Sequence, residues 1–147
     1  MKALLPPVLV LIFAAAAILA SALLPADRVV PEAWRPWGWA LVAAGALLTA
    51  AARMQFARAR TAINTFAEPG TLVTGGAFRL SRNPMYLGFA AVLAGLAVRL
   101  GSASAIALAL LFVLIADRWY IAFEEARLRR RFGETYADYA RRTRRWL

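Results

Sequence analysis

Four long runs of apolar residues alternate with polar stretches along this 147-residue chain. They cover positions 4–24, 37–52, 85–98 and 101–116, and none of them contains a charged side chain. A helix needs about 20 residues to cross the roughly 30 Å hydrocarbon core of a bilayer. The first run reaches that length alone, and the others reach it once flanking Trp, Tyr and Arg side chains extend to the membrane interface.

The pattern therefore predicts an all-α fold, a polytopic membrane helix bundle that forms one domain. The expected membrane spans are 4–24, 37–57, 84–100 and 103–122, followed by a cytosolic amphipathic helical tail over 123–147. A soluble bundle is the alternative, but a water-soluble helix of this length shows a polar face, and these runs have none.

Small residues mark one face of the second and third spans. They are Gly38, Gly45 and Thr49 in the second span, with Gly88 and Gly95 in the third. Small side chains let membrane helices approach closely, so both spans are expected to pack tightly against neighbours.

The net charge of +10 is distributed unevenly along the chain. Connection 25–36 is neutral, connection 53–84 has five Arg against one Glu, and the tail from position 117 has nine Arg against five acidic residues. Basic residues collect on the cytoplasmic side of membranes, which predicts that both termini are cytoplasmic, in a bacterial inner membrane. Anionic lipid headgroups are the expected partners of this charge, and no nucleic-acid motif accompanies it.

The chain contains no Cys and no His. This excludes disulfides, thiolate nucleophiles, histidine bases and the commonest zinc ligands, so no metal is expected. Lys2, the first apolar run and "ASA" at 20–22 also fit a cleaved secretory signal, which leaves open whether the first span is retained.

The tail contains two further patterns. Gly133 is a plausible helix stop, and aromatic and polar residues recur around it at spacings of three and four, as in an interfacial amphipathic helix: Phe132, Tyr136, Tyr139, Thr143 and Trp146. Four residues before Gly133 are separated by spacings of four, three and four, which places them on one face of a helix. They are Asp117, Ile121, Glu124 and Leu128.

Candidate chemistry lies where the third span begins and the fourth ends. "SRNPMYLG" (81–88) opens the third span, with proline at a first helical position where it costs no hydrogen bond. The tight turn "GSASA" makes the third and fourth spans a hairpin, which brings Arg82, Asn83 and Tyr86 within one or two helical turns of Glu124 and Glu125. Charged groups at membrane depth are costly unless paired or functional, so the residues alone leave ordinary ion pairing and a reactive site equally open.

Two stretches resemble a known superfamily. "GAFRLSRNPMYLG" (76–88) and "EEARLRRRFGETYADYARR" (124–142) are similar, in order and separation, to the paired motifs of isoprenylcysteine carboxyl methyltransferases and phospholipid methyltransferases. The resemblance covers roughly residues 70–147. It implies an integral-membrane enzyme that binds S-adenosylmethionine, with S-adenosylhomocysteine as product, and methylates a lipophilic acceptor at the cytosolic membrane face.

Residue by residue, the resemblance assigns cofactor binding to six positions and catalytic roles to two of them. The cofactor-binding positions are Arg82, Asn83, Tyr86, Gly88, Glu124 and Glu125. Arg82 and Glu124 are the expected catalytic residues. Phe78 stands where the family usually has Tyr, and Asn83 replaces the His of the isoprenylcysteine branch, which weakens the case for that substrate.

Several alternatives stay open at the level of sequence. The acceptor can be a carboxylate, an amine or a thiol, and if it is an amine either glutamate can serve as the base. A sterol-type reductase that uses NADPH on a similar scaffold, and a non-catalytic membrane protein, are the competing functions. The oligomeric state is also undetermined.

Overall fold

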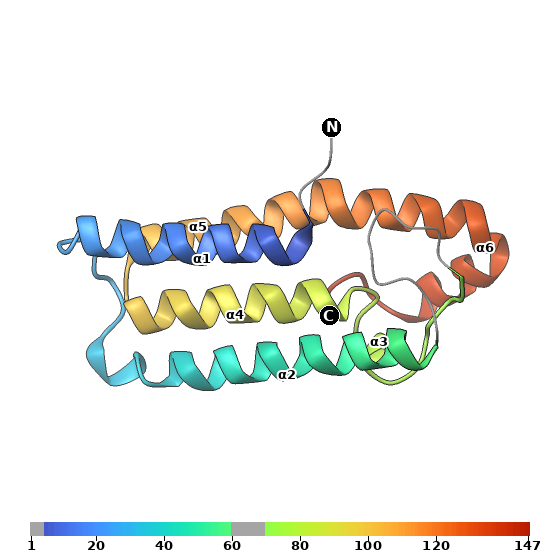
Figure 1. The fold of residues 1–147 in the computed structure, drawn as a ribbon, viewed down its shortest axis with the longest axis horizontal. Helices are drawn as coiled ribbons and strands as arrows, with labels where there is room; N and C mark the ends of the chain where they lie inside the picture. Colours follow the sequence, from blue (N-terminus) through green and yellow to red (C-terminus); the bar gives the residue numbers. More distant parts are fainter. Residues whose placement is uncertain (1–4, 60–69) are drawn as a thin grey trace.

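The computed structural model describes residues 5–59 and 70–147, and these are organised as helices (Figure 1). The principal helices are α1 (Pro6–Leu23), α2 (Trp37–Arg58), α4 (Pro84–Leu100), α5 (Ala103–Ile115) and α6 (Ala122–Arg142). Shorter elements are the 3-10 turn η1 (Glu32–Trp34), helix α3 (Ala77–Leu80) and the π-helical segment η2 (Ala116–Ile121). The predicted all-α bundle is confirmed.

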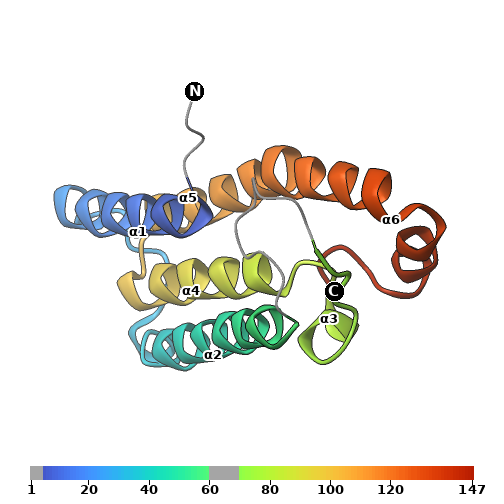
Figure 2. The same cartoon turned by 45° about the vertical axis from the view of Figure 1, so that its right-hand side comes forward.

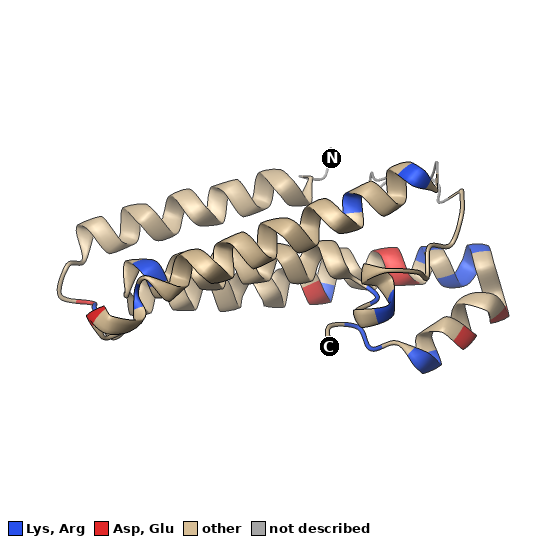
Figure 3. Ribbon diagram, turned by 90° about the horizontal axis from the view of Figure 1, so that it is seen from below, with Lys and Arg blue, Asp and Glu red and all other residues tan. Residues whose placement is uncertain are grey.

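Three helical segments among the described residues are long and apolar enough to cross a membrane. They are Pro6–Leu23, Glu32–Arg58 and the apolar part of Ala103–Arg142. Helix α4 is apolar but has only 17 residues, which lies at the short end of the range for a membrane span. Within the described residues, Pro6–Leu23, residues 37–52 and Ala103–Ile115 carry no charged side chain, and the charged residues lie toward the ends of these apolar segments (Figure 3).

Helix α4 lies between α2 on one side and the α1–α5 pair on the other (Figures 1 and 2). Its contact with α2 is backbone against backbone. A Cβ atom built on Gly45 would lie 2.5 Å from the carbonyl oxygen of Gly88, and one built on Gly95 would lie 2.6 Å from that of Gly38. The close approach predicted from the small residues is confirmed, and its partner helices are α2 and α4.

The α4–α5 turn is fastened to the connection between α1 and α2. Gly101 ends α4 with φ +74°, and its carbonyl oxygen accepts the N–H of Val29 at 2.8 Å. The Asp27 carboxylate accepts the Ser102 hydroxyl at 3.0 Å and the Ser104 N–H at 2.7 Å. We call this group the outer clasp. It fixes the predicted hairpin at the end of the bundle remote from α6.

Helices α5 and α6 are joined through η2 into one long rod, which turns back on itself within α6 (Figure 1). The reversal occurs at Gly133, whose φ of +49° interrupts the helix, so the predicted stop is confirmed. The η2 segment was not predicted. It invalidates the expectation of one continuous α-helical face from Asp117 to Leu128, because a π turn shifts the residues that follow relative to those before it.

The helix after Gly133 does not use its aromatic face as predicted. Tyr136 is 1% exposed and Tyr139 is 6% exposed. Both pack with Ala52 of α2 and Phe78 of α3 in a cluster separate from the membrane core. The amphipathic pattern is real, but because α2 and α3 offer an apolar surface at this end of the bundle, the tyrosines face the protein instead of the membrane interface.

Residues 60–69 of the connection 53–84 lie outside the described residues. Within the same connection, residues 77–80 form the single helical turn α3.

Candidate functional site

The corner before α4 is shaped by its own side chains. Pro84 occupies the first position of α4, and the Asn83 N–H donates to the Ser81 hydroxyl at 3.0 Å. Proline supplies no N–H and has a φ already suited to a helix, so α4 can begin directly at the corner. This local geometry directs the Arg82 side chain toward α6.

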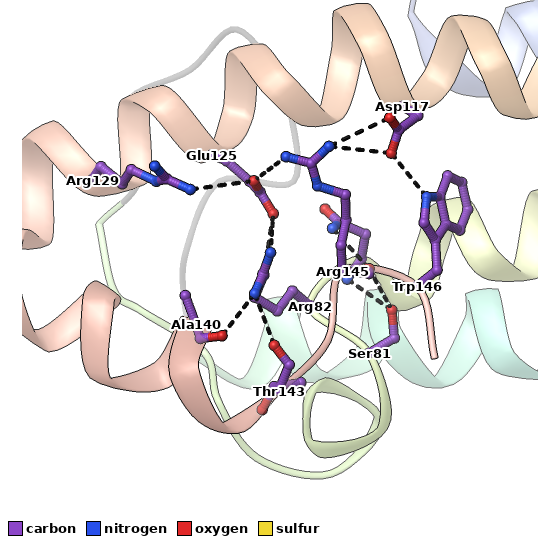
Figure 4. A network of polar contacts seen from close by, with 10 residues as sticks. Ser81, Arg82, Asp117, Glu125, Arg129, Ala140, Thr143, Arg145 and Trp146 are labelled. Carbon is purple, nitrogen blue, oxygen red and sulfur yellow. Dashed lines mark hydrogen bonds and ion pairs between the residues drawn. The ribbon is translucent and has the colours of Figure 1, made fainter.

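Arg82 forms a buried ion pair with Glu125 (Figure 4). Its Nη2 and Nε atoms donate to Oε1 of Glu125 at 2.9 and 3.1 Å, and Glu125 is only 3% exposed. A buried carboxylate is tolerated when it is paired and its oxygens accept hydrogen bonds. The predicted proximity of the third-span corner to the acidic pair is therefore confirmed.

Arg145 connects this pair to a second carboxylate. Its Nη2 donates to Oε2 of Glu125 at 2.7 Å, and its Nη1 donates to Asp117 at 3.2 Å. Trp146 Nε1 also donates to Asp117, at 2.9 Å. The hydrogen bond to Glu125 raises the pKa of Arg145 above its usual value and outweighs the opposing effect of burial, so the arginine remains a cation.

The corner also holds residues 143–146, which we call the C-terminal strap. Arg82 Nη1 donates to the carbonyl oxygen of Thr143 at 2.8 Å and to that of Ala140, at the end of α6, at 2.9 Å. The Ser81 hydroxyl and the Asn83 amide both donate to the carbonyl oxygen of Arg145, at 3.0 and 3.1 Å. Arg82 is thus engaged at all three of its side-chain nitrogens, and the Asn83 amide contacts the strap.

The second glutamate has a different environment. Tyr86 of α4 donates its hydroxyl to Oε1 of Glu124 at 2.7 Å. The Tyr86 ring is surrounded by other rings, with Phe89 edge-on at 6.3 Å and Tyr120 of η2 at 6.4 Å between centroids. One glutamate therefore belongs to an arginine network and its neighbour to an aromatic one.

Gly88 lies at the α2–α4 contact. A Cβ there would overlap the Thr49 hydroxyl and lie 2.6 Å from the Gly45 carbonyl oxygen. The structure thus gives Gly88 a packing role, and its cofactor-binding role stays a prediction.

Sequence reasoning missed Arg145 and Ser81, and it placed Asp117 on the same helical face as Glu124. In a continuous α-helix, residues 117 and 125 would differ by about 80° around the axis. The intervening π turn changes this offset, and Arg145 bridges Asp117 to Glu125. Trp146 was seen only as part of the amphipathic pattern, and its hydrogen bond to Asp117 shows that the strap returns to η2.

Comparison with known proteins identifies a matching family. The family model described as phospholipid methyltransferase matches residues 34–135, which includes α2, the corner, both glutamates and the Gly133 turn. An uncharacterized protein of Haemophilus influenzae is 35% identical over 63 residues, which are 43% of this chain and the whole of that protein. No solved structure matches the chain.

Proposed function

Because this chain belongs to the phospholipid methyltransferase family, we propose that it is a membrane enzyme that uses S-adenosylmethionine to methylate a lipophilic acceptor at the cytosolic face. Family membership implies methyltransferase activity, and the membrane-length helices agree with an integral membrane protein. The cofactor, the acceptor and the residue roles are the parts that we propose.

One observation carries the proposal. Two side chains at the start of α4 each contact one member of the acidic pair on α6, Arg82 with Glu125 at 2.9 Å and Tyr86 with Glu124 at 2.7 Å. Carboxylates, guanidinium groups and aromatic rings converge at one end of the bundle. A binding site requires that several such groups lie close together, whereas an isolated ion pair at the membrane interface requires only its two partners.

These residue types suit the chemistry of the methyl donor. S-adenosylmethionine supplies a methyl group on a positively charged sulfur, together with an ammonium, a carboxylate and ribose hydroxyls. Carboxylates and the faces of aromatic rings bind cationic groups, which fits Glu124, Tyr86 and Tyr120. A guanidinium binds carboxylates, which fits Arg145, whose side chain is 34% exposed; Arg82 is already held by Glu125 and by the carbonyl oxygens of Ala140 and Thr143.

We assign different roles to the two glutamates. Glu125 accepts hydrogen bonds from Arg82 and Arg145 on its two oxygens, so it holds the frame of the site and is poorly placed to take a proton. Glu124, hydrogen-bonded to a phenol, is the candidate base if the acceptor is an amine. Arg82 orients Glu125 and the C-terminal strap. Holding donor and acceptor in reactive geometry can contribute about 7–11 kcal/mol, so no protein nucleophile or metal is needed.

The acceptor enters from the bilayer in this proposal, and the positive surplus near the site supports a position at the cytosolic face. Phospholipid amines, lipid carboxylates and thiols remain the candidate acceptors, and membrane lipids are the expected partners.

The test is a calorimetric titration of the detergent-solubilised protein with S-adenosylhomocysteine and, separately, with NADPH. We expect S-adenosylhomocysteine to bind and NADPH not to bind. Glu124→Gln should weaken the affinity for S-adenosylhomocysteine at least tenfold, and the exposed control Glu134→Gln should leave it unchanged, since Glu134 pairs only with Arg141 among the described residues. Binding of NADPH alone would identify a reductase, and binding of neither compound would refute the enzymatic proposal.

A further inference from the structure

Arg145 of the C-terminal strap lies between two carboxylates of the rod formed by α5, η2 and α6 (Figure 4). Its Nη2 donates to Oε2 of Glu125 at 2.7 Å, and its Nη1 lies 3.2 and 3.4 Å from the two oxygens of Asp117. A guanidinium has five N–H groups, and the Nε of Arg145 donates to no acceptor in residues 5–59 and 70–147. Because the side chain is 34% exposed, Arg145 keeps the capacity to bind a further anion.

The charges around the two carboxylates favour such an anion. Within the part of the chain that the structure describes, the guanidinium groups paired with Glu125 and Asp117 outnumber them. These are Arg82, Arg118, Arg129 and Arg145. A bound carboxylate would reduce this positive surplus, and a guanidinium is the side-chain group best shaped to receive a carboxylate.

Arg145 is also held firmly in place. The π-helical segment η2 separates Asp117 from Glu125, and Arg145 reaches both across it. Its own carbonyl oxygen accepts the Ser81 hydroxyl at 3.0 Å and the Asn83 amide at 3.1 Å. Segments of π-helix inside α-helices are frequent at functional sites, and a binding group works best when its neighbours fix its orientation.

We propose that Arg145 binds the carboxylate of the amino-acid portion of the methyl donor, and that Asp117 is the positioning residue that orients the guanidinium for this contact. An amino acid carries its carboxylate and its ammonium on the same carbon, so its binding site needs a cation close to an anion. Arg145 is the cation, and Glu124, assigned above to cationic groups of the donor, follows in sequence directly before its partner Glu125. This inference rests on the proposed function and adds to it two residues outside those assigned from the sequence.

The test compares two ligands that differ in one group, S-adenosylhomocysteine and its decarboxylated analogue, which keeps the amine. Calorimetry on the full-length protein in detergent should show an affinity at least tenfold higher for S-adenosylhomocysteine, as expected for a hydrogen bond between charged groups. Arg145→Met should abolish this preference. The matched control Arg144→Met removes the same charge from the strap and should keep the preference, because the Arg144 side chain is exposed and pairs with no acidic group among the described residues.

Asp117→Asn tests the positioning role. The substitution keeps the size of the side chain and an oxygen that can accept the N–H of Trp146, but it removes the charge that holds Arg145. The affinity for S-adenosylhomocysteine should fall about threefold or more, and the affinity for the decarboxylated analogue should stay the same. An equal loss of affinity for both ligands would show that Asp117 only supports the fold. This milder variant also decides the matter if Arg145→Met does not fold.

The outcomes separate the inference from the function on which it rests. Failure of the unmodified protein to bind S-adenosylhomocysteine would refute the proposed function. Equal affinities of the unmodified protein for the two ligands would overturn the inference alone. A preference for S-adenosylhomocysteine that survives in Arg145→Met would overturn it as well, since Arg145 would then serve only to hold the C-terminal strap against the rod.

Discussion

Arg82→Met is the most informative perturbation of the arginine network. The substitution keeps an unbranched apolar side chain and removes the guanidinium, so Glu125 loses the partner at 2.9 Å. The carbonyl oxygens of Ala140 and Thr143 lose a charged donor at 2.9 and 2.8 Å. The Arg82 side chain is 13% exposed and that of Glu125 is 4% exposed, so water compensates little.

The expected loss of stability follows from these contacts. Breaking a buried ion pair from one side costs about 3–5 kcal/mol. Glu125 keeps its contact with Arg145 at 2.7 Å, so we expect the cost of breaking the ion pair to lie near the lower end of this range. The loss of a donor to the two carbonyl oxygens adds to that cost. We expect about 3–4 kcal/mol, which for a chain of this size corresponds to a decrease in melting temperature of roughly 10 °C.

The assay is thermal unfolding in detergent, followed by circular dichroism. Arg118→Met is the matched control, because Arg118 is 75% exposed and its nitrogen lies 3.5 Å from Asp117. An exposed pair contributes about 1 kcal/mol at most. In the double variant Arg82→Met/Glu125→Leu, the loss should be smaller than the sum of the single losses, since both remove one interaction. Equal melting temperatures for Arg82→Met and Arg118→Met would refute the reasoning.

Three further predictions concern the rest of the fold. Gly45→Val should lower the free energy of unfolding by about 2 kcal/mol or more, because its Cβ would lie 2.5 Å from a carbonyl oxygen of α4. Chemical denaturation measures this change. The control Gly75→Ala should have a smaller effect, because a Cβ at that position meets nothing within 4 Å. Hydrogen bonding by Ser104 lowers the pKa of Asp27, so its contribution to stability is present above its unfolded pKa of about 3.9 and is lost as the pH falls through the lower folded value. The protection factors of the outer-clasp amides, which correct exchange rates for their intrinsic dependence on pH, should therefore fall below about pH 4 in the unmodified protein and be low at every pH in Asp27→Ala; protection that does not change with pH in the unmodified protein would contradict this. Gly133→Ala should lower the free energy of unfolding by about 1–3 kcal/mol, because a residue with a Cβ rarely adopts the φ of +49° found here and would be strained. An unchanged melting temperature would show that there is no such backbone strain.

Much of the fold could be predicted from the sequence, because membrane-spanning helices are recognisable by their length and their lack of charged residues. The hairpin was predictable from "GSASA", and with it the meeting of Arg82 and Glu125, since a tight turn forces the ends of two adjacent helices to the same side. The Gly133 reversal was predictable for a similar reason, because glycine is the residue that most readily adopts a positive φ.

The C-terminal strap could not be predicted in the same way. Arg82 and Ser81 bind its backbone carbonyl oxygens, and every residue has a carbonyl oxygen, so the contact leaves no signature in residue types. The η2 segment was hidden for a related reason. Its sequence, "ADRWYI", has no Gly or Pro to mark a change of helix type. The change becomes evident only in the structure, where Asp117 and Glu125 share the partner Arg145.

The paired glycines of α2 and α4 also determine which parts of the bundle can move. Gly38 and Gly45 are seven residues apart, as are Gly88 and Gly95, and each glycine of one helix meets a glycine of the other. Displacing α4 along α2 by one helical turn, about 5.4 Å, would drive bulkier neighbours into the opposing main chain. The two helices are therefore expected to behave as one rigid plate that fixes the position of Arg82, and in the proposed enzyme the opening that admits an acceptor would form by movement of α1, α5 or α6.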